Sequence, residues 1–223
     1  MREGRAFGRI IPISMKISQR THTGRARAAL RKRDKRLGEL MRALDVPDIE
    51  PERNYFRSLA EIIIGQQLSG KAAETISKRF REIFGSVHTF PTPAEIRIAR
   101  ISTMRRAGLS RSKASYIKNL AAAIEEKRLE IKKLDRMGDA EIVAHLTAIK
   151  GIGPWTAEMF LMFSLARPDV FSFGDLGLRK AVRRLYGLRR DPDETTMRRI
   201  SNAWRPHRTL AARYLWASLD QKK

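Results

Sequence analysis

Apolar residues recur at the spacing of an α-helix along almost all of the chain after residue 36. The first such pattern is formed by Leu37, Leu40, Met41 and Leu44. Residues three, four and seven positions apart share one face of a helix, so this pattern indicates an amphipathic helix. The longest alternating run, which would suit a strand, is only Ile10–Ile13. The sequence therefore predicts an all-α protein of about ten helices joined by short turns.

Cap residues mark where several of these helices begin. Ser69, Ser110 and Asp139 each stand directly before an apolar periodic segment, and their side-chain oxygens can accept a hydrogen bond from a free amide of the first turn. We expect these three residues to be N-caps.

Composition limits the classes of function. The 223-residue chain has a formal net charge of +22, which attracts polyanions and favours nucleic acid over an anionic membrane surface as the partner. It has no cysteine, which excludes disulfides, thiolate zinc sites and an iron–sulfur cluster, and its four histidines are scattered. No apolar run approaches the length of a membrane span. We expect a soluble intracellular protein without membrane contact.

Basic residues are concentrated at the amino terminus. Residues 1–36 contain twelve Lys and Arg against Glu3 and Asp34. Three interpretations stay open: a flexible basic tail along DNA, assigned to residues 1–27; an organelle transit peptide, which is also Arg-rich and acid-poor; and a true start at Met15. The corresponding locations are the cytoplasm with nucleoid association, the nucleus in a eukaryote, or an organelle.

A glycine turn between two predicted helices, at residues 146–157, carries the most information about function. The segment reads LTAIKGIGPWTA, and Asp175 follows just past the next apolar helix. Amides at a helix start are free to bind an anion such as a phosphate. A carboxylate near a bound DNA phosphate would face a nucleotide, which is the layout of a base-excising enzyme.

Four motifs in order resemble the helix-hairpin-helix DNA glycosylase superfamily, in its 3-methyladenine DNA glycosylase II branch. They are IGQQLSGKAA at 64–73, GLSRSKA at 108–114, GIGPWTA at 151–157 with Asp175, and WRPHR at 204–208 with Trp216. The resemblance runs from about Leu37 to Leu219 and points to the compact members that lack an amino-terminal β-rich domain. It implies two helical subdomains flanking a cleft: residues 28–54 with 176–223, and the hairpin subdomain 55–175, which ends at Asp175.

The resemblance assigns DNA contacts to the hairpin. Backbone amides around Lys150, Gly151, Gly153 and Thr156 would hold a phosphate. The carbonyls of Thr147, Ile149 and Ile152 would coordinate Na⁺ or K⁺ when DNA is bound, with no other cofactor. Further candidates for phosphate contacts, near helix starts, are Arg111, Lys113 and Arg179. In so basic a chain, however, basic side chains at the surface are often simply solvated.

Asp175 matches the catalytic aspartate of the family. Breaking an N-glycosidic bond develops positive charge on the sugar, which a nearby carboxylate stabilises. Asp175 also precedes a predicted helix, so it can act as an N-cap, and both roles can hold together.

Trp155 stands where lyase-competent relatives have a lysine. Since tryptophan cannot form a Schiff base, we expect base release without strand cleavage. Trp155 and Trp216 would stack on a flipped cationic base, with Met159 and Leu176 completing the pocket where larger relatives have tyrosines. The alternative is that both tryptophans belong to the core. With so few aromatic groups, broad activity on hypoxanthine is not expected.

A second turn, at Gln66, Gln67, Leu68 and Ser69, matches the wedge loop of the family. A side chain from this loop would fill the gap that a flipped base leaves, either Gln67 or Leu68, while Gln66 touches a base edge. The alternative is an ordinary turn with Leu68 packed inward.

The sequence therefore predicts a monofunctional glycosylase for alkylated purines in double-stranded DNA, acting in base excision repair. The competing hypotheses are a non-catalytic helix-hairpin-helix DNA-binding protein, a basic RNA-associated protein, and a glycosylase for other damaged or mismatched bases. We expect a monomer, since no unpaired apolar stripe or heptad seam is visible.

Overall fold

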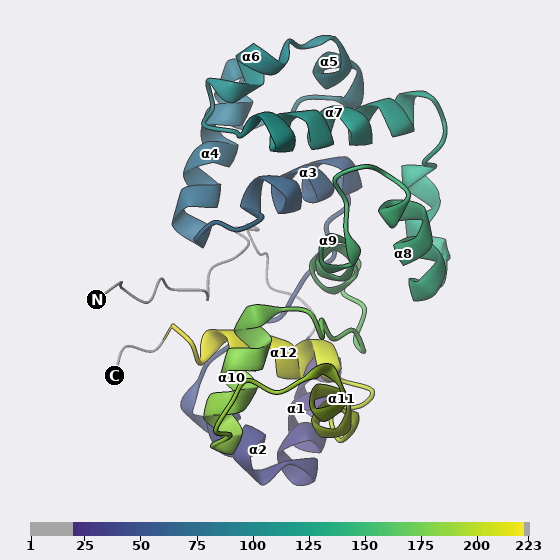
Figure 1. Ribbon diagram of the computed structural model, residues 1–223. Helices are drawn as coiled ribbons and strands as arrows, with labels where there is room; N and C mark the ends of the chain where they lie inside the picture. Colours follow the sequence, from purple (N-terminus) through teal and green to yellow (C-terminus); the bar gives the residue numbers. More distant parts are fainter. Residues whose placement is uncertain (1–19, 221–223) are drawn as a thin grey trace, which may run out of the picture. The chain divides into compact units, whose positions relative to one another are not determined.

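The protein is helical throughout the part that its structure, a computed structural model, describes, namely residues 20–220 (Figure 1). This part contains twelve α-helices, one 3-10 helix, one π-helix and no strand. The predicted all-α class is confirmed.

The chain divides into two compact units. One consists of residues 20–51 and 166–220, and we call it the terminal unit; the other consists of residues 52–165, and we call it the hairpin unit. The terminal unit contains α1 Arg20–Arg33, α2 Lys35–Ala43, α10 Leu176–Tyr186, α11 Glu194–Asn202 and α12 Arg208–Ala217. The hairpin unit contains α3 Tyr55–Gly65, α4 Gly70–Ile83, α5 Pro93–Ile98, α6 Ile101–Arg105, α7 Arg111–Glu125, the 3-10 helix η1 Ile131–Arg136, α8 Asp139–Thr147, α9 Pro154–Met159 and the π-helix η2 Phe160–Ser164.

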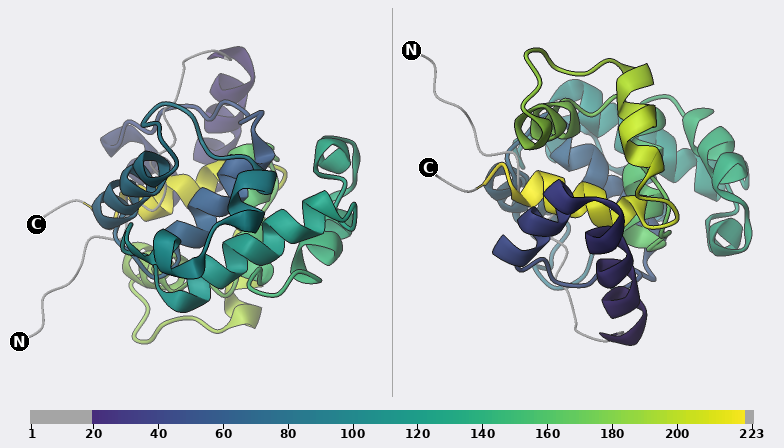
Figure 2. Two further views of the ribbon diagram at one scale, coloured as in Figure 1. Left: turned by 90° about the horizontal axis from the view of Figure 1, so that it is seen from above. Right: turned by 90° about the horizontal axis from the view of Figure 1, so that it is seen from below.

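Helix α12 is the centre of the terminal unit. It packs against α1, α2 and α10, as the right-hand view of Figure 2 shows. It is the most apolar helix of this unit, with buried residues from Thr209 to Trp216. Between the helices, Oδ2 of Asp34 accepts hydrogen bonds from the Tyr186 hydroxyl and from Nε1 of Trp204, the latter at 2.8 Å. Asp34 also caps α2 through Oδ1, which lies 3.0 Å from the amide of Leu37.

Helix α7 is the centre of the hairpin unit. It lies between α5 and α3 and packs against both (Figure 1). Ser110 caps its start and Ser69 caps α4, as predicted, with bonds from the amides of Lys113 and Ala72. Helix α8 differs from the prediction, because its N-cap is Gly138 and Asp139 is already its first helical residue.

The structure moves two predicted boundaries. Helix α1 begins at Arg20, inside the segment 1–27 that was assigned to a tail, and Arg27 pairs with Asp48 at 2.8 Å. Residues 1–19 lie outside the described part. The hairpin unit ends at residue 165 rather than 175, so Asp175 belongs to the terminal unit. The reason is that residues 167–170 bind the start of α12, with Arg208 pairing with Asp169 at 2.8 Å and the amide of Thr209 bonding to Pro168.

None of the helices between residues 20 and 220 combines the length and the apolar character needed to cross a bilayer.

Candidate functional site

The predicted helix-hairpin-helix segment is present in the hairpin unit. Helix α8 ends at Thr147, and α9 starts at Pro154 with Gly153 as its N-cap. Gly151 has a φ of +105°, which L-residues rarely adopt. A Cβ at this position would lie 2.1 Å from Cγ of Tyr116 on α7, so the Tyr116 ring also requires the missing side chain. Both the positive φ angle and the nearby Tyr116 ring therefore restrict position 151 to glycine.

Gln66 joins the wedge turn to the hairpin. Its Nε2 donates to Oγ1 of Thr156 at 3.0 Å and approaches the carbonyl oxygen of Gly151 at 3.4 Å. Thr156 is 2% exposed, and its hydroxyl accepts this bond inside the unit. An external anion could therefore contact only the backbone N–H of Thr156. In this structure Nε2 of Gln66 makes these internal contacts, and the predicted contact of Gln66 with a base edge stays a prediction.

Gln67 lies at the exposed tip of the turn between α3 and α4. Its φ is +57°, a left-handed conformation that costs a non-glycine residue roughly 1–3 kcal/mol. Leu68 is half-buried, and its amide bonds to Gly65 at 3.0 Å, while Ser69 caps α4. Of the two predicted tip residues, Gln67 is the one that the turn presents.

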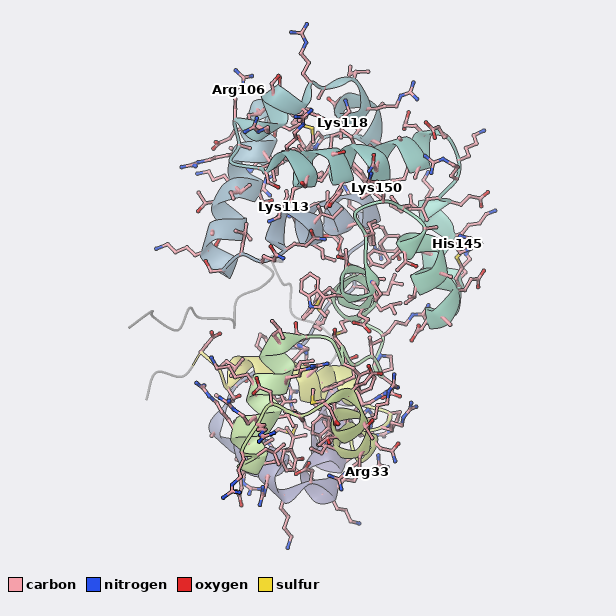
Figure 3. All side chains as sticks on the ribbon, in the orientation of Figure 1. Arg33, Arg106, Lys113, Lys118, His145 and Lys150 are labelled. Atoms are coloured by element: carbon pink, nitrogen blue, oxygen red, sulfur yellow. The ribbon has the colours of Figure 1, made fainter. Side chains whose placement is uncertain are left out.

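Lys113 has a different partner from the predicted phosphate. Its Nζ donates to the carbonyls of Ile64 at 2.8 Å and Gln66 at 2.6 Å, and burial lowers its pKa. Figure 3 shows Lys113 at the start of α7, on the side of α3. The ammonium therefore neutralises the carbonyl end of α3, where the helix dipole is negative.

Two other basic side chains, those of Lys150 and Arg111, are exposed to solvent, as a contact with an external phosphate requires. Lys150 is exposed at the hairpin (Figure 3), and its carbonyl accepts a 3.0 Å bond from Nδ2 of Asn119. Arg111 is exposed in the first turn of α7.

Asp175 is the N-cap of α10 in the terminal unit. Its Oδ1 accepts a 2.7 Å bond from the amide of Leu178 and a 3.0 Å bond from Nε1 of Trp216 on α12. The residue is 7% exposed. A side-chain donor and a helix start thus orient one carboxylate, and both predicted roles of Asp175, cap and reactive group, are geometrically compatible.

The loop before Asp175 is held by aromatic packing. Phe171 contacts Trp204 at 5.5 Å and Phe173 at 5.3 Å between ring centroids, and the Arg198 guanidinium lies 4.2 Å from the Phe173 centroid. Nε of Arg179, a predicted phosphate ligand, donates to the Phe173 carbonyl at 3.0 Å. These contacts fix the backbone from which the carboxylate projects.

Trp216 lies against Asp175 in the terminal unit, and its predicted stacking on a base stays a prediction. The side chain is 6% exposed, and its indole faces Asp175 and the backbone of Gly177. A Cβ at Gly177 would lie 3.3 Å from Nε1 of Trp216 and 3.0 Å from Oδ1 of Asp175, so the glycine leaves room for this bond. Trp216 is thus largely buried, and its indole N–H contacts the Asp175 carboxylate.

The three other predicted pocket residues differ in exposure. Trp155 is half-buried in the first turn of α9, which leaves part of its ring accessible. Met159 has no exposed surface, and Leu176 is 72% exposed. Met159 is therefore buried and Leu176 lies open to solvent, and their place in a base pocket stays a prediction.

The hairpin carbonyls suit a monovalent cation. Thr147 is the last residue of α8, where carbonyls lack intrahelical partners and the dipole is negative, and Ile149 and Ile152 follow in the turn. The Ile149 carbonyl accepts one bond, from the Ile152 amide at 3.0 Å, and a carbonyl has a second lone pair. Elsewhere in residues 20–220, no group of three or more acidic or histidine side chains could hold a metal ion.

A model of the HhH-GPD superfamily of base excision DNA repair proteins matches residues 60–206, which include the wedge turn, the hairpin and Asp175. The chain belongs to this superfamily. The predicted resemblance is confirmed.

Individual superfamily members extend the comparison. DNA-3-methyladenine glycosylase 1 of Schizosaccharomyces pombe is 39% identical over 166 residues, which are 74% of this chain and 72% of the relative. A Bacillus subtilis protein provisionally named a DNA-3-methyladenine glycosylase is 34% identical over 171 residues, 75% of this chain, and the chain spans 60% of that relative. The solved structure of the S. pombe 3-methyladenine DNA glycosylase with abasic DNA has a TM-score of 0.80 at 35% identity, covering 89% of this chain and 100% of that one.

Sequence reasoning missed two residues that support the superfamily hairpin, Tyr116 and Asn119. With Lys113 they form a row at three-residue intervals on α7, and residues three apart share one helix face. The available signal was a lysine, a tyrosine and an asparagine at three-residue intervals on one helix. Only the fold shows that this face contacts the wedge turn and the hairpin.

Proposed function

We propose that this protein is a monofunctional DNA glycosylase that hydrolyses the N-glycosidic bond of alkylated purines in double-stranded DNA and leaves an abasic site. The observation that carries the proposal is the Asp175 carboxylate, which two donors orient in a chain of the HhH-GPD superfamily. The names of the relatives support alkylated bases as the substrate, and the solved complex with abasic DNA supports DNA as the partner.

The reaction requires a negatively charged carboxylate near the sugar, and it does not require a strong general acid to protonate the leaving base. A purine alkylated at N3 or N7 carries a positive charge and leaves with the bonding electron pair, which neutralises it. The sugar becomes oxocarbenium-like, and the negative charge of Asp175 stabilises this state. Water then adds to C1′ and loses a proton. Because the bonds from Leu178 and Trp216 hold the carboxylate in place beforehand, little reorganisation is required in the transition state.

Trp155 accounts for base release without strand cleavage. It occupies the lysine position of the lyases that this sequence resembles, and an indole cannot attack C1′ to form a Schiff base. The accessible part of its ring can instead contact a cationic base, an interaction of roughly 0.5–2 kcal/mol.

The hairpin and the wedge turn would bind the damaged duplex. Amides at the start of α9, together with the exposed Lys150, bind a phosphate. Carbonyls of Thr147, Ile149 and Ile152 would hold a Na⁺ or K⁺ ion that adds positive charge toward the same phosphate. Gln67, exposed at the turn tip, fills the gap left by the flipped nucleotide. We further propose that the protein acts as a monomer.

The test is base release from methylated duplex DNA, followed by chromatography of the free bases. The wild type should release 3-methyladenine or 7-methylguanine, with strands intact until alkali is added. Asp175→Asn should lose about 10²–10⁴ in single-turnover rate, as for removal of one strong electrostatic stabiliser, and still bind DNA.

The matched control is Asp193→Asn. Asp193 caps α11 through a 2.8 Å bond from the Thr196 amide, just as Asp175 caps α10, but none of the four motifs quoted for the resemblance contains it. It should excise at the wild-type rate. DNA binding without any base release by the wild type would favour the non-catalytic hypothesis, and full activity of Asp175→Asn would refute the assigned role.

A further inference from the structure

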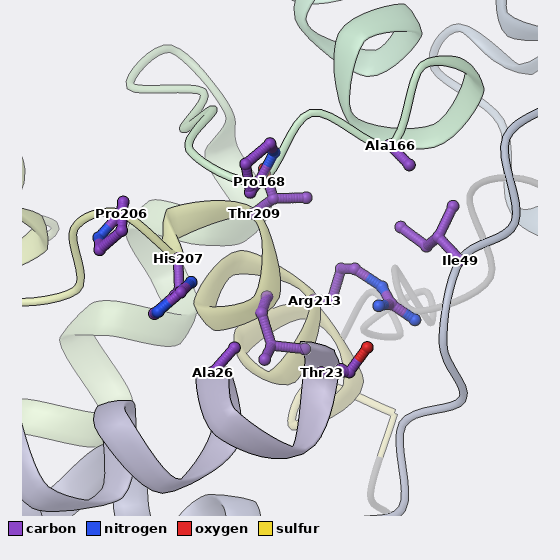
Figure 4. Close-up of a pocket in the computed structure, with 10 residues that line it drawn as sticks. Thr23, Ala26, Ile49, Ala166, Pro168, Pro206, His207, Thr209 and Arg213 are labelled. Carbon is purple, nitrogen blue, oxygen red and sulfur yellow. The ribbon is translucent and has the colours of Figure 1, made fainter. Parts of the chain in front are cut away.

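The terminal unit contains a cavity of about 420 Å³ that none of the proposed catalytic or DNA-binding residues lines (Figure 4). Its residues come from α1, the segment after α2, the segment that starts at residue 166, and α12. They are Thr23, Ala26, Ile49, Ala166, Pro168, Pro206, His207, Thr209, Leu210 and Arg213. The volume lies within the range of small-molecule sites, and such sites combine apolar walls with a few placed polar groups.

The placed polar group of this cavity is the guanidinium of Arg213. The residue is only 8% exposed, and Figure 4 shows its side chain reaching into the space between Ile49 and Thr23. Within residues 20–220 its one hydrogen bond goes to the carbonyl of Pro47. A guanidinium has five N–H donors in a planar fork, so most of its donor capacity is directed elsewhere.

The charge of Arg213 is not balanced by its neighbours. The nearby carboxylate, Asp48, is already paired with Arg27, whose Nη2 lies 2.8 Å from Oδ1 and 2.7 Å from the carbonyl of Val46. The cluster of two arginines and one aspartate therefore carries a net positive charge. Burial lowers the pKa of Arg213 to about 10, and repulsion from Arg27 acts in the same direction, against the attraction of Asp48. A buried cation in this position is stabilised by an anion.

We propose that this cavity binds a small organic carboxylate with an apolar body, whose carboxylate pairs with Arg213. Ala26, Ile49 and Leu210 supply apolar surface for the body of the ligand. One guanidinium matches a singly charged carboxylate in a bidentate pair. A doubly charged phosphate would leave one charge uncompensated, because Arg27 is engaged and burial lowers the pKa of His207, which favours its neutral form.

The experiment titrates the full-length protein with 4-phenylbutyrate, with its neutral analogue 4-phenylbutanamide, and with inorganic phosphate, by isothermal titration calorimetry. We expect saturable binding of one carboxylate per chain, with the amide and the phosphate at least about tenfold weaker. Arg213→Gln should weaken carboxylate binding by a similar factor. Ala26→Leu, which keeps the charge and fills part of the cavity, should also weaken it at an unchanged melting temperature.

Arg136→Gln is the control for attraction to the overall positive charge, because Arg136 is exposed in η1 of the hairpin unit. It should bind the carboxylate as the wild type does. If Arg213→Gln does not fold, Ala26→Leu decides the outcome. Absence of saturable binding, equal affinity for the amide or for phosphate, unchanged affinity in Ala26→Leu, or an equal loss in Arg136→Gln would each overturn the proposal.

Discussion

Nε1 of Trp216 donates a 3.0 Å hydrogen bond to Oδ1 of Asp175, from a ring that is 6% exposed. The amide of Leu178 donates to the same oxygen at 2.7 Å. The orientation of the carboxylate thus depends on the start of α10 and on a side chain of α12. This bond gives Trp216 a candidate positioning role, and its predicted stacking on a base stays a separate prediction.

Trp216→Phe separates positioning from stacking, because phenylalanine keeps an aromatic ring and loses the N–H donor. A hydrogen bond to a charged group contributes about 1.5–3 kcal/mol, so we expect single-turnover excision to fall roughly 10- to 100-fold with DNA affinity nearly unchanged. Tyr186→Phe, which removes a bond to Asp34 instead, should lower the unfolding free energy and largely preserve the rate. Wild-type excision by Trp216→Phe would contradict the positioning role.

Gly151→Ala should destabilise the hairpin unit by about 2 kcal/mol or more, since it adds a Cβ at a φ of +105° and against Tyr116. Urea unfolding measures this loss. Gly153→Ala is the control in the same turn, because nothing lies within 4 Å of its added Cβ, and it should cost less than about 1 kcal/mol. Combination with Tyr116→Ala should relieve only the steric part, so the two changes should be non-additive; full additivity would mean that the ring is not the obstacle.

Gln67→Gly should dissociate stability from activity. Glycine adopts a φ of +57° without steric cost, so the unfolding free energy should stay equal or rise by up to about 1 kcal/mol. The loss of the exposed side chain should nevertheless slow base release if Gln67 fills the duplex. Leu68→Ala serves as the comparison, and a larger loss of excision there at equal stability would transfer the wedge role to Leu68.

Asp34→Ala should be strongly destabilising. It removes the cap of α2 and leaves the Tyr186 hydroxyl and the Trp204 indole without their acceptor, a combined cost on the order of 3 kcal/mol. Burial, and then the Asp34 carboxylate, raise the pKa of the Tyr186 phenol, so it stays a donor at neutral pH. Asp34→Asn keeps a single acceptor oxygen, which can cap α2 but cannot also accept from Tyr186 and Trp204, and it should lose less than Asp34→Ala. Equal unfolding free energies for both variants would show that the network contributes little.

His207 should make stability depend on pH. Burial, followed by repulsion from Arg33, lowers its pKa below the ordinary value of 6.5, against an opposing effect of Asp169. The unfolded chain therefore binds the proton more tightly, and the unfolding free energy should decrease as pH falls from about 6.5 to the folded-state pKa. Below that pKa this contribution is constant. His207→Asn should show a flatter decrease in urea titrations between pH 7.5 and 5, and an unchanged slope would exclude His207 as the source.

Local pattern predicted the all-helical class and three of the four caps that were assigned from the sequence. Ser69, Ser110 and Asp175 each bond an amide three residues ahead, so a short window of sequence contains the whole interaction. Asp139 was misplaced by one position, because Gly138 adopts the extended cap conformation without a side-chain bond.

Local sequence pattern could not predict contacts between segments that are distant in the sequence. Trp216 and Asp175 are 41 residues apart, and an aromatic residue on an apolar helix is compatible with either a pocket or the core. Lys113 looks like a phosphate ligand by its place at a helix start, yet α3 brings two carbonyls to it. Residues 166–175 belong to the terminal unit because Asp169 pairs with Arg208, which lies 39 residues further along the chain.

Nε2 of Gln66 donates to Thr156 in the hairpin, while the backbone carbonyl of Gln66 accepts from Nζ of Lys113. Separating the wedge turn from the hairpin breaks the side-chain hydrogen bonds of Gln66, so we expect the two turns to open together. Their backbone amides should exchange with solvent deuterium as one cooperative group, in step with the first turns of α7. A protein scanning a duplex would then test the backbone and the base stack with a single rigid surface.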